Sequence, residues 1–126
     1  MNEGNSTVVL VMEDRGSPPR SEVEQWLRDR MKGWHDHDVL LVGVVVGELL
    51  DNAQRYGAPP YVLELVLDQW VEALTIRLRN RAPRHSAGWT SGAGLLTVDA
   101  LTEQWGVVSA AEHTTVWAKI RFDGGP

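Results

Sequence analysis

The spacing of hydrophobic positions predicts five strands in this chain. Apolar and polar side chains alternate strictly over residues 73–79, which is typical of a strand with one buried face. Residues 61–67 alternate less strictly, and the two runs are expected to form an antiparallel pair. Residues 8–12 are continuously apolar and predict a strand of buried type. The runs 105–108 and 114–122 predict a C-terminal hairpin.

Other apolar residues recur at the spacing of an α-helix. The pattern over residues 21–32 predicts an amphipathic helix, and residues 94–101 predict a second buried helix. Between them, residues 39–47 are apolar almost all round, which predicts a central helix covered by protein on most of its surface. Asp38 is the expected N-cap of this helix, and Gly57 is its expected left-handed C-terminal cap.

Length and charge restrict the class of protein. The 126 residues suffice for a single domain, 1–126, with one core, and the polar ends 1–7 and 123–126 are expected to be flexible. The net charge of −5 argues against binding to nucleic acid or to a membrane surface. The chain has no cysteine and no apolar run of membrane-spanning length, so a cytoplasmic protein is expected.

One long segment and several tryptophans bear on function. Residues 80–93 show no periodicity, and loops of this length inside a domain are usually functional. Trp89 lies in this loop, where it could stack on a base, dock against a partner or pack within the loop. Trp26, Trp105 and Trp117 fall on faces expected to pack into the core.

Polar residues appear only toward the end of the central helix. Glu48 and Asn52 are four residues apart and therefore lie one turn apart on the same face, with Asp51 and Arg55 beside them. A carboxylate above a carboxamide on a helix packed into a core indicates a candidate catalytic face. The alternative is a helix end with solvated polar residues.

A metal site is a second, weaker candidate at residues 35–38, which read His-Asp-His-Asp. Imidazoles and carboxylates are common metal ligands, but consecutive side chains do not converge on one ion without a further element. We therefore favour a helix-capping function for this segment.

The decapeptide from Glu48 to Gly57 resembles the N-box of the GHKL ATPase superfamily, in the form seen in bacterial anti-sigma factor serine kinases. The resemblance implies the Bergerat ATP-binding fold, an α/β (α+β) two-layer sandwich with helices on one face of a mixed, mostly antiparallel sheet. It further implies that ATP and Mg²⁺ are the cofactors. Glu48 would orient or deprotonate the attacking group, and Asn52 would hold the magnesium ion.

A second motif extends the resemblance over nearly the whole chain. Gly92–Val98 resembles the second glycine box of the family, where backbone N–H groups at a helix start can approach phosphate. The nucleotide contacts implied by the resemblance are Asn52, Arg55, Asn80, Gly92, Gly94, Leu95 and Thr115.

The first glycine box departs from the family pattern. Family members usually carry an aspartate at the end of the strand, followed by glycine, whereas this chain reads Arg79–Pro83 with Asn80 in that position. A neutral amide can still accept a hydrogen bond from adenine, but it loses about 1 kcal/mol of charge-assisted strength. Ala93 likewise stands where the family often has a larger, basic residue.

Two functions follow from the resemblance. The first is an ATP-dependent serine/threonine protein kinase that regulates transcription by partner switching, with a sigma factor and an anti-sigma-factor antagonist as partners. The resemblance is also compatible with a homodimer. The alternative is a degenerate interaction module that keeps the fold and binds nucleotide weakly or not at all, because Asn80 and Ala93 depart from the motif.

Overall fold

The computed structural model describes residues 5–12, 20–68, 72–81, 93–110 and 112–122 of the chain. Its elements follow the order β1 (Asn5–Met12), α1 (Arg20–Arg30), α2 (Asp36–Tyr56), β2 (Ala58–Asp68), β3 (Ala73–Arg81), α3 (Ala93–Leu101), β4 (Gln104–Ser109) and β5 (His113–Arg121).

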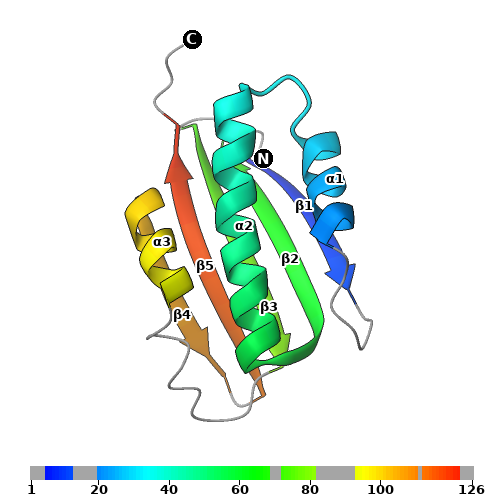
Figure 1. Cartoon of the computed structure of the whole chain (residues 1–126), viewed down its shortest axis with the longest axis vertical. Helices are drawn as coiled ribbons and strands as arrows, with labels where there is room; N and C mark the ends of the chain where they lie inside the picture. The colour runs from blue at the N-terminus through cyan, green and yellow to red at the C-terminus, as the bar shows by residue number, and fades with distance from the viewer. Residues whose placement is uncertain (1–4, 13–19, 69–71, 82–92, 111, 123–126) are drawn as a thin grey trace.

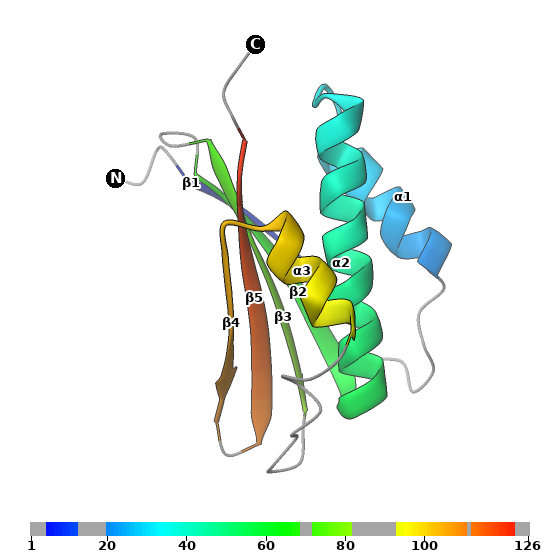
Figure 2. The ribbon, with the colours of Figure 1, turned by 60° about the vertical axis from the view of Figure 1, so that its left-hand side comes forward.

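The strands form one sheet, and the helices cover one side of it. The strand order is β1-β2-β3-β5-β4, and each described pairing is antiparallel. Figures 1 and 2 show α1, α2 and α3 together on the same side of the sheet. The predicted two-layer α+β fold class is therefore confirmed, with antiparallel pairings throughout the described sheet.

The core lies between α2 and the middle strands. Val42, Val45 and Leu49 of α2 are fully buried, as are Ile76 and Leu78 of β3. Burial of side chains of this size contributes roughly 1.5–3 kcal/mol each, so α2 is held mainly by its apolar surface. Figure 1 shows why that surface extends around the helix: α1 flanks α2 on one side and α3 on the other.

The N-terminal strand corrects two expectations. Residues 5–7, expected to be flexible, are part of β1 and pair with β2, whereas residues 1–4 and 123–126 lie outside the described residues. The strand was also expected to be buried, yet Val9 is 50% and Val11 is 53% exposed. The reason is that β1 is an edge strand, and these two residues face the side of the sheet without helices.

Both ends of α2 differ from the predicted caps. The N-cap is His35 rather than Asp38, so Asp36 and Asp38 lie in the first turn, where negative charge is favourable. Gly57 has an extended backbone with φ of −135° instead of a left-handed one, and its N–H donates to the Ala53 carbonyl. Residues 35–38 do not form a group of metal ligands in the described part of the chain.

The prediction for Trp117 was wrong. β5 alternates between buried and half-buried residues, with Val116, Ala118 and Ile120 facing the helices. Trp117 therefore points to the open side of the sheet. Trp26 and Trp105 are partly buried and pack against the core, as expected. Trp89 lies outside the described residues.

No helix among the described residues is long and apolar enough to cross a membrane.

Candidate functional site

The end of α2 meets the end of β3 on the helix-covered side of the sheet. Asn52, one turn before the end of α2, is 5% exposed, and Asn80, in the penultimate position of β3, is 0% exposed. Thr114 of β5 pairs directly with Asn80 and is 4% exposed. Within the described core these three are the buried polar residues, and we call them the polar cluster.

Gly57 allows Asn80 to reach the helix end. A methyl group at Gly57 would overlap the carboxamide of Asn80 and would lie 3.0 Å from the Ala53 carbonyl oxygen. Because its backbone is extended, the requirement for glycine comes from this close approach and not from the backbone conformation. The C-terminal end of α2 at Gly57 is thus packed tightly against the end of β3.

Asn80 has one amide atom bonded and the other unpaired. Its Nδ2 donates to the Arg81 carbonyl oxygen at 2.9 Å, and its buried Oδ1 has no hydrogen-bond partner among the described residues. The reverse orientation of the amide would set Oδ1 against the Arg81 carbonyl, so this bond fixes which atom is left open. A buried acceptor without a partner costs about 1–3 kcal/mol, and a ligand that donates a hydrogen bond would remove that cost.

Asn52 is similar, because its buried Nδ2 also lacks a described partner. This nitrogen is a donor that a phosphate oxygen could accept from, whereas a metal ion would need the amide oxygen of the same side chain. Mg²⁺ is commonly held by one or two protein oxygens, substrate phosphates and water. The described residues form no group of three or more acidic or histidine ligands. The Asn52 amide oxygen would thus be the protein ligand, and the other ligands of such an ion would have to be phosphate groups and water.

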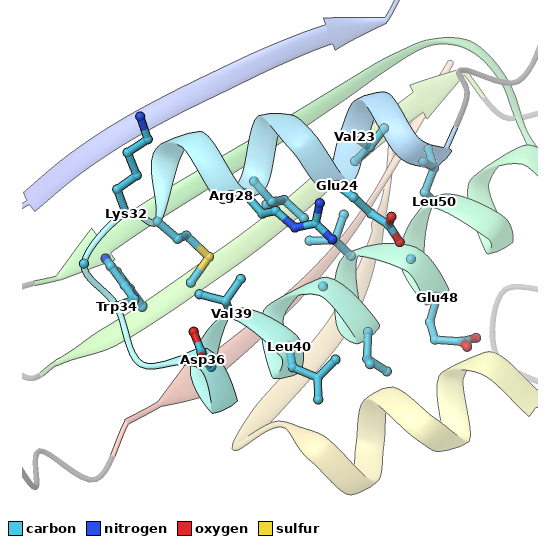
Figure 3. A pocket seen from close by; sticks show the side chains of 17 residues that line it. Val23, Glu24, Arg28, Lys32, Trp34, Asp36, Val39, Leu40, Glu48 and Leu50 are labelled. Atoms are coloured by element: carbon cyan, nitrogen blue, oxygen red, sulfur yellow. The ribbon is translucent and has the colours of Figure 1, made fainter.

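Glu48 lies one turn before Asn52 and lines a groove of about 620 Å³ between α1 and α2. Figure 3 shows Glu48 at the α2 side of this groove, with Glu24 and Arg28 on α1. The Glu48 carboxylate is half-buried and has no hydrogen bond or ion pair with another described residue.

Arg55 is positioned differently from the other predicted ligands. Its guanidinium bonds Asp51 one turn earlier at 3.2 Å, and the two side chains are 63% and 51% exposed. Exposed pairs of this kind contribute only about 0.3–0.5 kcal/mol. Arg55 is thus a surface residue at the rim of the helix end and does not belong to the polar cluster.

The remaining predicted ligands are divided between the two sides of the sheet. Gly94 lies in the first turn of α3, and Leu95 is buried against the core beside α2, whereas Gly92 lies outside the described residues. Thr115 does not join the polar cluster, because alternation along β5 turns it to the open side of the sheet. Thr114 is the neighbour that faces Asn80. It is distinguished from Thr115 because it is buried and is paired with another buried polar residue across the sheet.

Comparison with known proteins gives a likeness in fold. No family model matches the chain, and no curated protein matches it. Among solved structures, the crystal structure of the RsbU and RsbW domains of Rv1364c from Mycobacterium tuberculosis matches with a TM-score of 0.71 at 17% sequence identity. The match covers 92% of this chain and 32% of that one, so the chain spans about a third of the neighbour's length. At this identity the match carries the fold alone.

Proposed function

We propose that the chain is an ATP-binding regulator of the GHKL type that acts by partner switching, and that it phosphorylates a serine or threonine of an antagonist protein. The single observation that carries the proposal is the unpaired, buried Oδ1 of Asn80, which lies where the end of β3 meets the N-box helix. The amino group of adenine is a donor that would satisfy this acceptor.

Each residue of the site has a task in this proposal. Asn80 selects the base, Thr114 supports it from the paired strand, and Asn52 contributes an amide oxygen to Mg²⁺. The ion supplies charge neutralisation for the phosphate groups when it is bound. Glu48 accepts the proton of the attacking hydroxyl, since its carboxylate has no described partner. The proposal uses Thr114 in place of Thr115, because Thr114 faces Asn80.

The fold likeness supports the same proposal from outside the site. The matched structure is named for RsbU and RsbW domains, and the resemblance of Glu48–Gly57 to the N-box is independent of that match. The resemblance to the N-box implies a sigma factor and an anti-sigma-factor antagonist as the expected partners.

A transfer assay tests the kinase activity. The protein is incubated with γ-labelled ATP, Mg²⁺ and a panel of antagonist proteins, and the label is followed into serine or threonine. Transfer that requires Glu48 is the expected result. Absence of transfer to every candidate at high enzyme concentration would exclude the kinase activity but leave nucleotide binding to be measured directly.

The second candidate function is an interaction module that binds nucleotide weakly or not at all, and one observation favours it. Asn80 is neutral and is followed by Arg81 within β3, so the strand continues past the position where the family has aspartate and then glycine. Titration with ATP separates the two candidates, because submillimolar binding contradicts the module.

A further inference from the structure

The side of the sheet without helices concentrates positive charge in a chain whose net charge is −5. Five of the twelve basic residues alternate outward along two neighbouring strands. They are Arg77, Arg79, Arg81, Lys119 and Arg121. We call this side of the sheet, which faces away from the helices (Figure 2), the open face.

Some of these charges are neutralised within the sheet and others are not. Arg77 bonds Glu64 of β2 at 3.2 Å, and Arg121 bonds Glu103 at 3.3 Å. Arg79, Arg81 and Lys119 form no ion pair with any other described residue. The open face therefore keeps three cations without an ion-pair partner among the described residues.

Trp117 lies beside these cations on the same face. Its partner on β4 is Gly106, and a methyl group there would lie 2.9 Å from the indole nitrogen and 3.0 Å from Cε2. Glycine thus lets the indole lie across β4. The indole N–H has no acceptor among the described residues and remains a free donor.

Of these side chains, Arg77, Arg79 and Trp117 line a groove of about 650 Å³, together with residues of all four neighbouring strands β2 to β5. Pairing across the sheet sets Val62, Arg79, Thr115 and Val108 in one row and Glu64, Arg77 and Trp117 in the next. The groove therefore offers a guanidinium, an indole N–H and a hydroxyl as donors between apolar walls. Tryptophan and arginine are also the residues most enriched at the energetic centres of protein interfaces.

We propose that the open face is a docking surface for an acidic segment of another protein, with a carboxylate on Arg79 and an apolar side chain against Trp117. Charge complementarity selects an acidic partner, and the valine walls select one with apolar side chains. A nucleic acid is disfavoured because the net charge of −5 repels its backbone beyond the groove. The proposal goes beyond the proposed function and does not depend on nucleotide binding.

The test is a titration of the ¹⁵N-labelled full chain followed by NMR. The probes are a short peptide of alternating aspartate and leucine, its asparagine counterpart, and a short oligothymidylate. The acidic peptide is expected to shift the Trp117 indole signal and the amides of β3 and β5. The neutral peptide should bind more weakly, and the oligothymidylate should produce no comparable shifts.

Two charge reversals make the test specific. Arg79→Glu should weaken binding of the acidic peptide by about tenfold. Arg28→Glu makes the same change in net charge on α1, on the other side of the molecule, and should change the affinity less than twofold. Because Arg79 is exposed, its variant should fold, and Arg79→Gln provides a milder replacement that should weaken binding to a smaller extent.

Several results would overturn the proposal. These are no shift at millimolar peptide, shifts confined to α1 and α2, equal losses from Arg79→Glu and Arg28→Glu, or a response to oligothymidylate alone. Shifts at the open face that grow with protein concentration in the absence of peptide would show that a second copy of the chain occupies it instead.

Discussion

Asn80 is the residue on which the proposed nucleotide recognition rests, and its replacement separates binding from stability. Asn80→Asp removes the bond to the Arg81 carbonyl and buries a charge, so the free protein should lose about 1–3 kcal/mol of stability in urea unfolding. The same carboxylate would accept the adenine amine more strongly and should tighten ATP by about 1 kcal/mol. Calorimetry that shows unchanged ATP affinity would indicate that adenine is not read at Asn80.

Glu48 and Asn52 should fail in different ways when each is replaced by alanine. Glu48→Ala should keep nucleotide affinity within about twofold and lose phosphate transfer, because a general base acts in the transition state. Asn52→Ala should weaken binding only when Mg²⁺ is present. Titrations with and without Mg²⁺, beside the transfer assay, give both readouts. Small and equal effects of the two variants would instead identify the helix end as a solvated surface.

At the scale of single residues, the sequence predicts which side chains share a helix face, but not which side chains of other elements they contact. The spacing of Glu48 and Asn52 on one helix follows from the period of 3.6 residues, and the structure keeps both on α2. The contact of Asn80 with Gly57 joins residues 23 positions apart and depends on how α2 packs against β3, which no local pattern contains. Likewise, the strand register is needed to see that Thr114, and not Thr115, is the residue paired with Asn80.

Among the elements, α2 offers a matched pair of glycine substitutions. Gly57→Ala should cost roughly 1–3 kcal/mol and weaken ATP binding, because the added methyl displaces the Asn80 carboxamide. A Cβ at Gly43 would meet no atom within 4 Å, so Gly43→Ala should stabilise the helix interior by about 0.5–1 kcal/mol and leave ATP binding unchanged. Urea unfolding and calorimetry of both variants check the pair, and equal effects would contradict the packing described for Gly57.

Strand β2 carries a buried tyrosine that should make stability fall at high pH. Burial raises the pKa of the Tyr61 hydroxyl above its ordinary value of 10.0. Below pH 10 both states are protonated and stability is unaffected. Above about pH 10 the unfolded chain loses the proton first, so stability should fall by up to about 1.4 kcal/mol per pH unit until the folded pKa is reached.

Comparison with Tyr61→Phe isolates this effect from other groups that titrate in the same range. The variant should lose stability less steeply between pH 10 and 11 than the unmodified protein, as measured by urea unfolding at each pH. Identical slopes would show that the Tyr61 hydroxyl ionises equally easily in the folded state.

Helices and strands with a clear hydrophobic period were predicted well. The positions of the strands within the sheet, at an edge or in the middle, were not. The strict alternation of residues 73–79 gave the correct inward face of β3. The continuous apolar run of β1 was interpreted as buried on both faces, because its sequence does not reveal that the strand lies at the edge of the sheet. Trp117 was expected on a core face, but the alternation of β5 turns it to the open side of the sheet.

In the whole molecule, the two sides of the sheet have different chemistry. The helix-covered side encloses the polar cluster, while the open face presents Arg79 and Trp117 to solvent. A sheet covered on one side only can therefore hold a ligand on one side and a partner on the other.

Calorimetric titration of the unmodified chain with ATP and with GTP, each with Mg²⁺, tests the central claim that the polar cluster receives adenine. ATP should bind with a Kd below about 1 mM, and GTP should bind at least about tenfold more weakly, because the guanine carbonyl would oppose the unpaired Oδ1 of Asn80. Equal or tighter binding of GTP, or no heat from either nucleotide at millimolar concentration, would contradict the account.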